Sequence, residues 1–133
     1  MTIDMRKVKV LLIDDEPFIR STLSQILINI GFKNVYEADS VQKGLNEALR
    51  VRPGLVFCDI HMPGEDGFVF VSEIRNDGMP DVAATPIVML TSDSGHDAVL
   101  NAKELKVNGY LVKPVSINSV KRAIERALKV TLA

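Results

Sequence analysis

Short apolar runs alternate with helix-type patterns along the chain, and this alternation limits the folds that the chain can adopt. The runs are rich in Val, Ile and Leu and are too short for helices, which is typical of buried strands. The predicted strands span 8–13, 34–38, 55–59, 86–90 and 110–112. Strands that alternate with helices in this way indicate an α/β fold with a parallel sheet and helices on both faces.

The first two helices follow from apolar side chains spaced about 3.6 residues apart. The first is expected from about Pro17 to Gly31, and the second after Ser40, a typical N-cap residue. The apolar face of the second helix is expected to consist of Val41, Leu45, Ala48 and Leu49. Pro53 and Gly54 then break the chain before the third strand.

The later helices are predicted by the same spacing. The segment 68–71, FVFV, has the composition of a strand, but the alternation favours a helix that buries Gly67, Phe70, Val71 and Ile74. A loop is expected over 76–85 and a weakly amphipathic helix over 98–105. The last helix is expected to bury Ile117, Val120, Ile124, Ala127 and Leu128.

Composition excludes several classes of protein. The chain has 133 residues, the size of one domain, and a net charge of −1 without a basic run, so nucleic-acid binding is not expected. Its single cysteine, Cys58, excludes an internal disulfide framework. Neither a membrane helix nor a secretory signal is recognisable. These observations predict one soluble, cytoplasmic domain over 1–133.

Polar residues follow the predicted strands at the points where they end. Asp14 and Asp15 follow the first strand, Asp59 ends the third, Thr91 follows the fourth and Lys113 follows the fifth. Ligands of such sheets bind outside the carboxyl ends of the strands, so we expect these side chains to surround one pocket.

The chemistry of this set suggests phosphoryl transfer. Neighbouring carboxylates resist ionising together, and a divalent cation relieves their repulsion. Mg²⁺ suits one or two carboxylates and leaves room for a phosphate oxygen. An aspartate can act as a nucleophile towards phosphorus, and metal and lysine can neutralise the charge of the transferred group. Asp59 and Lys113 are therefore the candidate nucleophile and counter-charge.

The whole pattern resembles the receiver domain of bacterial two-component response regulators, and single-domain chemotaxis regulators in particular. The matching segments are LLIDDE, FCDIHMPGEDG, LTS and GYLVKP, in this order along the chain. The resemblance implies a flavodoxin-like (βα)5 three-layer sandwich with strand order 2-1-3-4-5. It also implies phosphorelay signalling without turnover of a substrate.

The resemblance assigns roles to the acidic residues. Asp59 is implied as the phospho-acceptor. Asp15 and Asp59 are implied as direct ligands of Mg²⁺, together with the backbone carbonyl of His61. Asp14 is implied to act on the metal through water.

It also assigns the residues that read the phosphoryl group. Lys113 is implied to pair with the phosphoryl oxygens, and the Lys113–Pro114 bond to be cis. Thr91 is implied as the switch hydroxyl and Tyr110 as the aromatic side chain that turns inward with it. The implied output face spans about 95–129.

The implied partners are proteins. The phosphodonor would be a sensor histidine kinase or a histidine phosphotransfer protein, and the output a downstream protein target or output domain. The chain would be a monomer or a phosphorylation-dependent dimer.

Simpler interpretations of single residues stay open from the sequence. Glu16 is interpreted as a helix-start residue, and Thr91 could cap the next loop. Tyr110 could be a half-buried strand aromatic. Cys58 is interpreted as a core residue.

The sequence disfavours three other functions. A haloacid-dehalogenase-type phosphatase would need DxDxT after the first strand, where this chain has DDEPF. A flavin-binding module would need a phosphate-cradling loop at the same place, and the acids there would repel phosphate. A receiver that has lost phosphorylation is disfavoured by intact Asp15, Asp59, Thr91 and Lys113.

Overall fold

The structure is a computed structural model that describes residues 3–92 and 106–132. Its main sheet contains β1 (Lys9–Ile13), β2 (Asn34–Ala38), β3 (Leu55–Asp59), β6 (Ile87–Thr91) and β7 (Gly109–Val112). The strands are parallel and lie in the order β2-β1-β3-β6-β7. Because β6 and β7 are the fourth and fifth predicted strands, the expected order 2-1-3-4-5 is confirmed.

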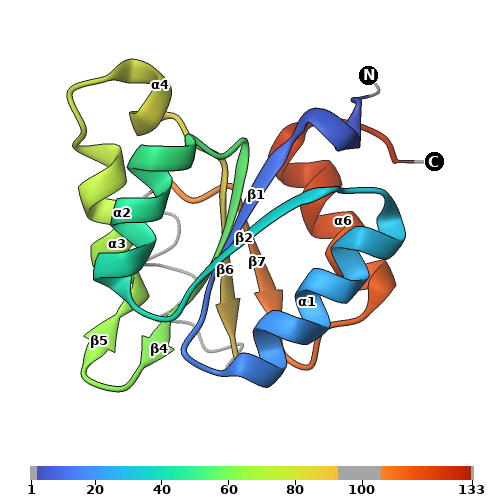
Figure 1. The fold of residues 1–133 in the computed structure, drawn as a ribbon, viewed down its shortest axis with the longest axis horizontal. Coiled ribbons are helices and arrows are strands. Elements are labelled where there is room, and N and C mark those ends of the chain that lie inside the picture. Colours follow the sequence, from blue (N-terminus) through green and yellow to red (C-terminus); the bar gives the residue numbers. More distant parts are fainter. Residues whose placement is uncertain (1–2, 93–105, 133) are drawn as a thin grey trace.

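Helices cover both faces of this sheet (Figure 1). On one face lie α2 (Val41–Val51) and α3 (Gly67–Arg75), and on the other lie α1 (Pro17–Ile30) and α6 (Ile117–Leu128). The predicted helix over 98–105 lies outside the described residues. The architecture is therefore the expected three-layer α/β/α sandwich.

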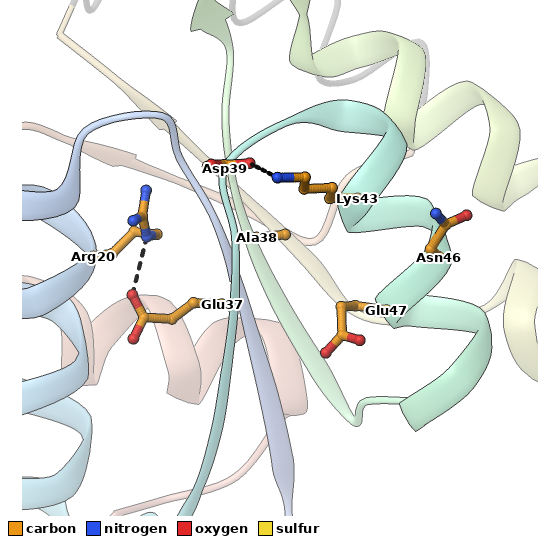
Figure 2. Close-up of a pocket in the computed structure, with 7 residues that line it drawn as sticks. All are labelled: Arg20, Glu37, Ala38, Asp39, Lys43, Asn46 and Glu47. Atoms are coloured by element: carbon orange, nitrogen blue, oxygen red, sulfur yellow. Dashed lines mark hydrogen bonds and ion pairs between the residues drawn. The ribbon is translucent and has the colours of Figure 1, made fainter.

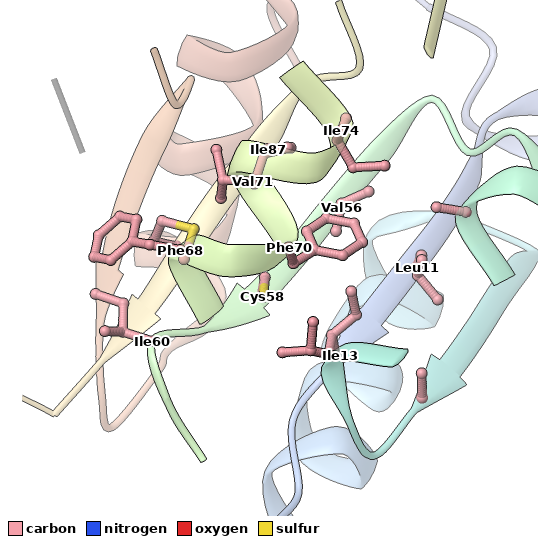
Figure 3. Close-up of a cluster of buried hydrophobic side chains, with 14 of the residues drawn as sticks. Leu11, Ile13, Val56, Cys58, Ile60, Phe68, Phe70, Val71, Ile74 and Ile87 are labelled. Carbon is pink, nitrogen blue, oxygen red and sulfur yellow. The ribbon is translucent and has the colours of Figure 1, made fainter. Parts of the chain in front are cut away.

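Two apolar clusters hold the layers together. The first fills the space between the sheet and α2 and α3, and Figure 3 shows Phe70 of α3 beside side chains of β1 and β3. The second lies on the opposite face, where Leu23 and Leu27 of α1 and Ile124 of α6 are buried. Every residue of β3 and β6 is buried, so these strands form a rigid base for the residues at their ends.

Most local predictions are confirmed. Ser40 caps α2 by accepting a hydrogen bond from the Lys43 amide at 3.2 Å. The FVFV segment is helical, and the four side-chain positions expected on its buried face are buried. Cys58 is a fully buried core residue.

The predicted apolar faces of two helices, α2 and α6, were wrong at one residue each. Leu49 of α2 is 49% exposed and Ile117 of α6 is 44% exposed. The reason for α2 is Gly44, because a Cβ there would lie 2.6 Å from the Ile13 Cδ1 atom. The helix packs closely against β1 through this glycine, which turns Ala48 to the core and Leu49 outwards.

Short elements were also missed. The predicted loop 76–85 contains α4 (Pro80–Ala83), which begins with proline at its first helical position. A hairpin of β4 (His61–Met62) and β5 (Glu65–Asp66) follows β3, and a 3₁₀ turn, η1 (Met5–Lys7), precedes β1. The hairpin lies at the carboxyl edge of the sheet (Figure 1) and forms one side of the site.

Candidate functional site

The parallel register brings the strand ends to one edge of the sheet. Ile13 lies opposite Cys58, and Asp59 lies opposite Leu90, so the acids after β1 and at the end of β3 are neighbours. The Lys113 amide donates to the Thr91 carbonyl at 2.7 Å, which fixes the lysine beside the end of β6.

Four carboxylates gather at this edge. Asp14, Asp15, Glu16 and Asp59 each offer an oxygen, and these oxygens lie within 4.8 Å of one another. Asp14 is 1% exposed and Asp59 is 3% exposed, whereas Asp15 is half-buried and Glu16 is exposed. The structure therefore brings together the predicted acids and adds Glu16.

Lys113 is the cation of this cluster. Its Nζ lies 3.0 Å from Asp14 Oδ2, 3.4 Å from Asp59 Oδ1 and 3.4 Å from Glu16 Oε1. Burial alone would lower the pKa of Lys113, but the carboxylates, Asp14 foremost, raise it above its ordinary value. The lysine is therefore a fixed positive charge shared among carboxylates.

Asp59 is held in an environment that resists its ionisation. Burial and then the charge of Asp14 raise its pKa from 3.8 to about 6, although Lys113 opposes both effects. Its Oδ1 faces Lys113, and its Oδ2 is buried with no hydrogen-bond donor among the described residues. A divalent cation at this edge would offset the repulsion between Asp59 and Asp14 and could coordinate the buried Oδ2 atom.

The donor set suits a hard divalent cation. All of its members are carboxylates, and oxygen ligands at a half-open site are what Mg²⁺ prefers. Nitrogen and sulfur donors, which favour zinc, are absent from the four clustered side chains. The chemistry and the unpartnered Asp59 oxygen therefore fit the predicted Mg²⁺.

The hairpin after β3 carries His61, whose side chain is exposed. Glu65 of the same hairpin accepts hydrogen bonds from the Val41 amide at 3.3 Å through both carboxylate oxygens. The Gly67 amide donates to the Ile60 carbonyl at 2.7 Å, and a Cβ at Gly67 would overlap the Asp59 carbonyl oxygen. The segment after Asp59 is thus fixed at the start of α2 and at the start of α3.

Thr91 and Tyr110 lie on the same face of the sheet. Thr91 pairs with Val112, and Tyr110 is two residues before Val112, so the side chains of all three point to the α3 side. Thr91 is fully buried and Tyr110 is half-buried against the first apolar cluster. The Lys113–Pro114 bond is cis, as the resemblance implied.

Three residues that support the site were not assigned to it from the sequence, where Glu16 was interpreted only as a helix-start residue. Glu16 is the residue before α1, but its side chain makes no capping hydrogen bond and instead faces Lys113. Arg20 donates to the Asp14 carbonyl, and Glu65 anchors the hairpin. Of these three residues, only Glu16 could have been assigned to the site from the sequence, because it directly follows Asp14 and Asp15.

The fold and this cluster of acids and lysine define a receiver-type domain. A family profile described as the response regulator receiver domain matches residues 10–125. The chain therefore belongs to the receiver family of two-component response regulators, which implies phosphorelay signalling.

Named relatives agree with this placement. The chain is 38% identical over 120 residues to the transcriptional regulatory protein PdtaR of Mycobacterium tuberculosis, covering 90% of this chain and 56% of that protein. It thus spans little more than half of that relative's length. It is 33% identical over 119 residues to a probable chemotaxis protein CheY of Rhizobium etli, covering 90% of this chain and 91% of that one.

A solved structure shows the same fold. The chemotaxis response regulator CheY4 of Vibrio cholerae matches with a TM-score of 0.81 and 30% identity, covering 90% of this chain and 98% of that one. Receiver domains act as signalling switches rather than as typical turnover enzymes. Within the described residues, no helix has both the length and the apolar character needed to span a membrane.

Proposed function

We propose that this chain is a single receiver domain that accepts a phosphoryl group on Asp59 in a Mg²⁺-dependent reaction. One observation carries the proposal: Asp59 is buried among carboxylates while the Lys113 ammonium contacts it and Asp14. A carboxylate that was only structural would gain nothing from this repulsion. A nucleophile gains a dry environment with a cation already in place.

In the proposed reaction a carboxylate oxygen of Asp59 attacks the phosphorus of a phosphohistidine on a partner protein. The new bond is P–O, and the P–N bond to the donor imidazole breaks with its electron pair moving to nitrogen. The product is an aspartyl phosphate on Asp59. The donor would be a sensor histidine kinase or a histidine phosphotransfer protein.

The proposed ligands of Mg²⁺ are Asp15, Asp59 and the backbone carbonyl of His61, with Asp14 acting through water. When bound, the ion would neutralise charge on the transferring group. The chain's own Lys113 would exchange its contact with Asp59 Oδ1 for phosphoryl oxygens while Asp14, at 3.0 Å, holds its charge in place.

The proposed switch consists of Thr91 and Tyr110. The hydroxyl of Thr91 would move towards the phosphoryl group, and Tyr110 on the same face would turn inward. The resulting change would appear on the face of β7 and α6, whereas residues 95–105 of the predicted output face lie outside the described residues. Its reader would be a protein target or an output domain.

Intact mass measurement tests the proposal. The chain is incubated with acetyl phosphate and Mg²⁺, and we expect the mass of one phosphoryl group to be added. The addition should be absent with EDTA and in Asp59→Asn, and unchanged in Asp81→Asn, which alters an exposed aspartate on α4. If Asp59→Asn still gains the group, the acceptor is wrong. If the wild-type chain gains nothing, the proposed Mg²⁺-dependent acceptance of a phosphoryl group is refuted.

A further inference from the structure

Arg20 connects the acid loop, residues 14–16 after β1, to the edge strand β2, which contributes no proposed ligand to the site. Its Nη1 donates to the backbone carbonyl of Asp14 at 2.6 Å, and its Nε donates to Glu37 Oε1 of β2 at 3.0 Å. The Arg20 side chain is 18% exposed and the Glu37 side chain is 45% exposed, so the guanidinium is largely covered while its ion pair with Glu37 reaches the surface.

The bridge is directed at one partner. Figure 2 shows Arg20 pointing at Glu37, while the nearby Asp39 points at Lys43 instead. Asp39 is paired with that lysine at 3.3 Å. Glu37 is therefore the carboxylate that orients the guanidinium, whose planar fork can serve two acceptors at fixed angles.

The carbonyl that Arg20 holds belongs to the peptide between Asp14 and Asp15. The same short segment is fixed by the Glu16 amide, which donates to Asp14 Oδ1 at 2.9 Å, and by the Asp14 amide, which donates to Ala38 at 3.1 Å. The plane of the Asp14–Asp15 peptide sets the direction in which the Asp15 side chain leaves the backbone. Arg20 therefore acts on a proposed metal ligand without touching the metal.

We propose that Arg20 is a positioning residue for the metal-binding acids and that Glu37 acts by holding Arg20. The inference rests on the proposed function for its metal, but the bridge itself can be tested without metal. Residues that orient metal ligands from outside typically contribute about 10- to 100-fold to metal affinity.

Whether the loss of Arg20 weakens or tightens Mg²⁺ binding distinguishes a positioning role from a simple effect of its charge. Arg20 is a cation near the acids, so an effect of charge alone would oppose Mg²⁺ and its removal would tighten binding. Positioning predicts the opposite, because a loosened loop must be ordered again when the ion binds. The variant Arg20→Met keeps most of the aliphatic stem while it removes both hydrogen bonds.

Isothermal titration with Mg²⁺ measures this. We expect Arg20→Met to raise the Kd about tenfold, and Glu37→Ala to raise it less. Glu37→Gln keeps an acceptor oxygen for Arg20, so its Kd should stay within about twofold of wild type. The double variant Arg20→Met/Glu37→Ala should be no weaker than Arg20→Met alone, because Glu37 acts through Arg20. Arg50→Met is the matched control, since Arg50 pairs with Glu47 on the surface of α2.

Hydrogen exchange in EDTA provides the readout that needs no metal. In Arg20→Met the amides of Asp14 and Glu16 should exchange about tenfold faster than in wild type, whereas amides of β3 should not change. Tighter or unchanged Mg²⁺ binding in Arg20→Met, or additive effects of the two substitutions, would overturn the proposal. If the wild-type chain binds no Mg²⁺, the proposed function fails. If the Asp14 and Glu16 amides also exchange at the wild-type rate in Arg20→Met, Arg20 does not hold the acid loop either.

Discussion

Replacing Asp59 by asparagine should stabilise the metal-free protein at neutral and alkaline pH. Burial and Asp14 raise the pKa of Asp59 from 3.8 to about 6, so the folded chain holds this proton more tightly than the unfolded chain. Ionising Asp59 therefore costs folding free energy, and the loss grows as the pH rises from about 4 to about 7. A shift of about 2 pH units corresponds to about 3 kcal/mol. Asparagine carries no charge and avoids this cost.

Urea unfolding in EDTA measures the difference. At pH 8 we expect Asp59→Asn to be about 3 kcal/mol more stable than wild type. At pH 4 the difference in stability should be less than about 1 kcal/mol. The surface change Asp81→Asn should stay within about 0.5 kcal/mol of wild type at both pH values. Added Mg²⁺ should stabilise wild type more than Asp59→Asn, because binding uses the carboxylate. Equal stabilities at pH 8, or an advantage that grows on acidification, would refute the reasoning.

Four further substitutions test the packing of two glycines, the contacts of Arg75 and the charge of Lys113. Gly67→Ala should destabilise the fold by more than about 2 kcal/mol in urea unfolding, because the new Cβ meets the backbone of Asp59. Gly44→Ala should cost less than Gly67→Ala, because its Cβ meets side-chain atoms of Ile13 and no backbone atom. Arg75→Met should lower the free energy of unfolding by about 2–3 kcal/mol, because Arg75 donates hydrogen bonds to several backbone carbonyls. These carbonyls lie far from the site, so the Kd for Mg²⁺ should not change. A changed Kd would contradict a purely structural role for Arg75. Lys113→Met should lower the Kd for Mg²⁺ at least about threefold in calorimetry at pH 8, because it removes a cation that competes for the carboxylates. A higher Kd would show instead that Lys113 organises the site.

The positions of the main strands and of the acids were predictable because they depend on simple rules. Apolar β-branched runs marked β1, β3 and β6, and the geometry of parallel sheets then required Asp14, Asp59 and Thr91 to share an edge. No knowledge of side-chain packing was needed for this step. The chemistry of a carboxylate cluster with one lysine followed directly.

The missed features depend on packing that no local pattern records. Leu49 fits an amphipathic stripe as well as Ala48 does, and only the contact between Gly44 and β1 decides which of them faces the core. Arg20 and Glu65 resemble ordinary surface charges in the sequence. Their roles depend on distances between segments that are 17 and 24 residues apart.

The stretch from Glu37 to Val41 has a consequence for protein design. It contributes no proposed ligand, yet Glu37 holds the bridge to the acid loop and the Val41 amide anchors Glu65 of the hairpin. A transplant of DDE and DIHMPGEDG onto another parallel sheet would carry the chemical groups without these two supports. We expect such a graft to bind ions loosely until the strand–helix junction is transplanted with it, because a site needs its supporting contacts as much as its ligands.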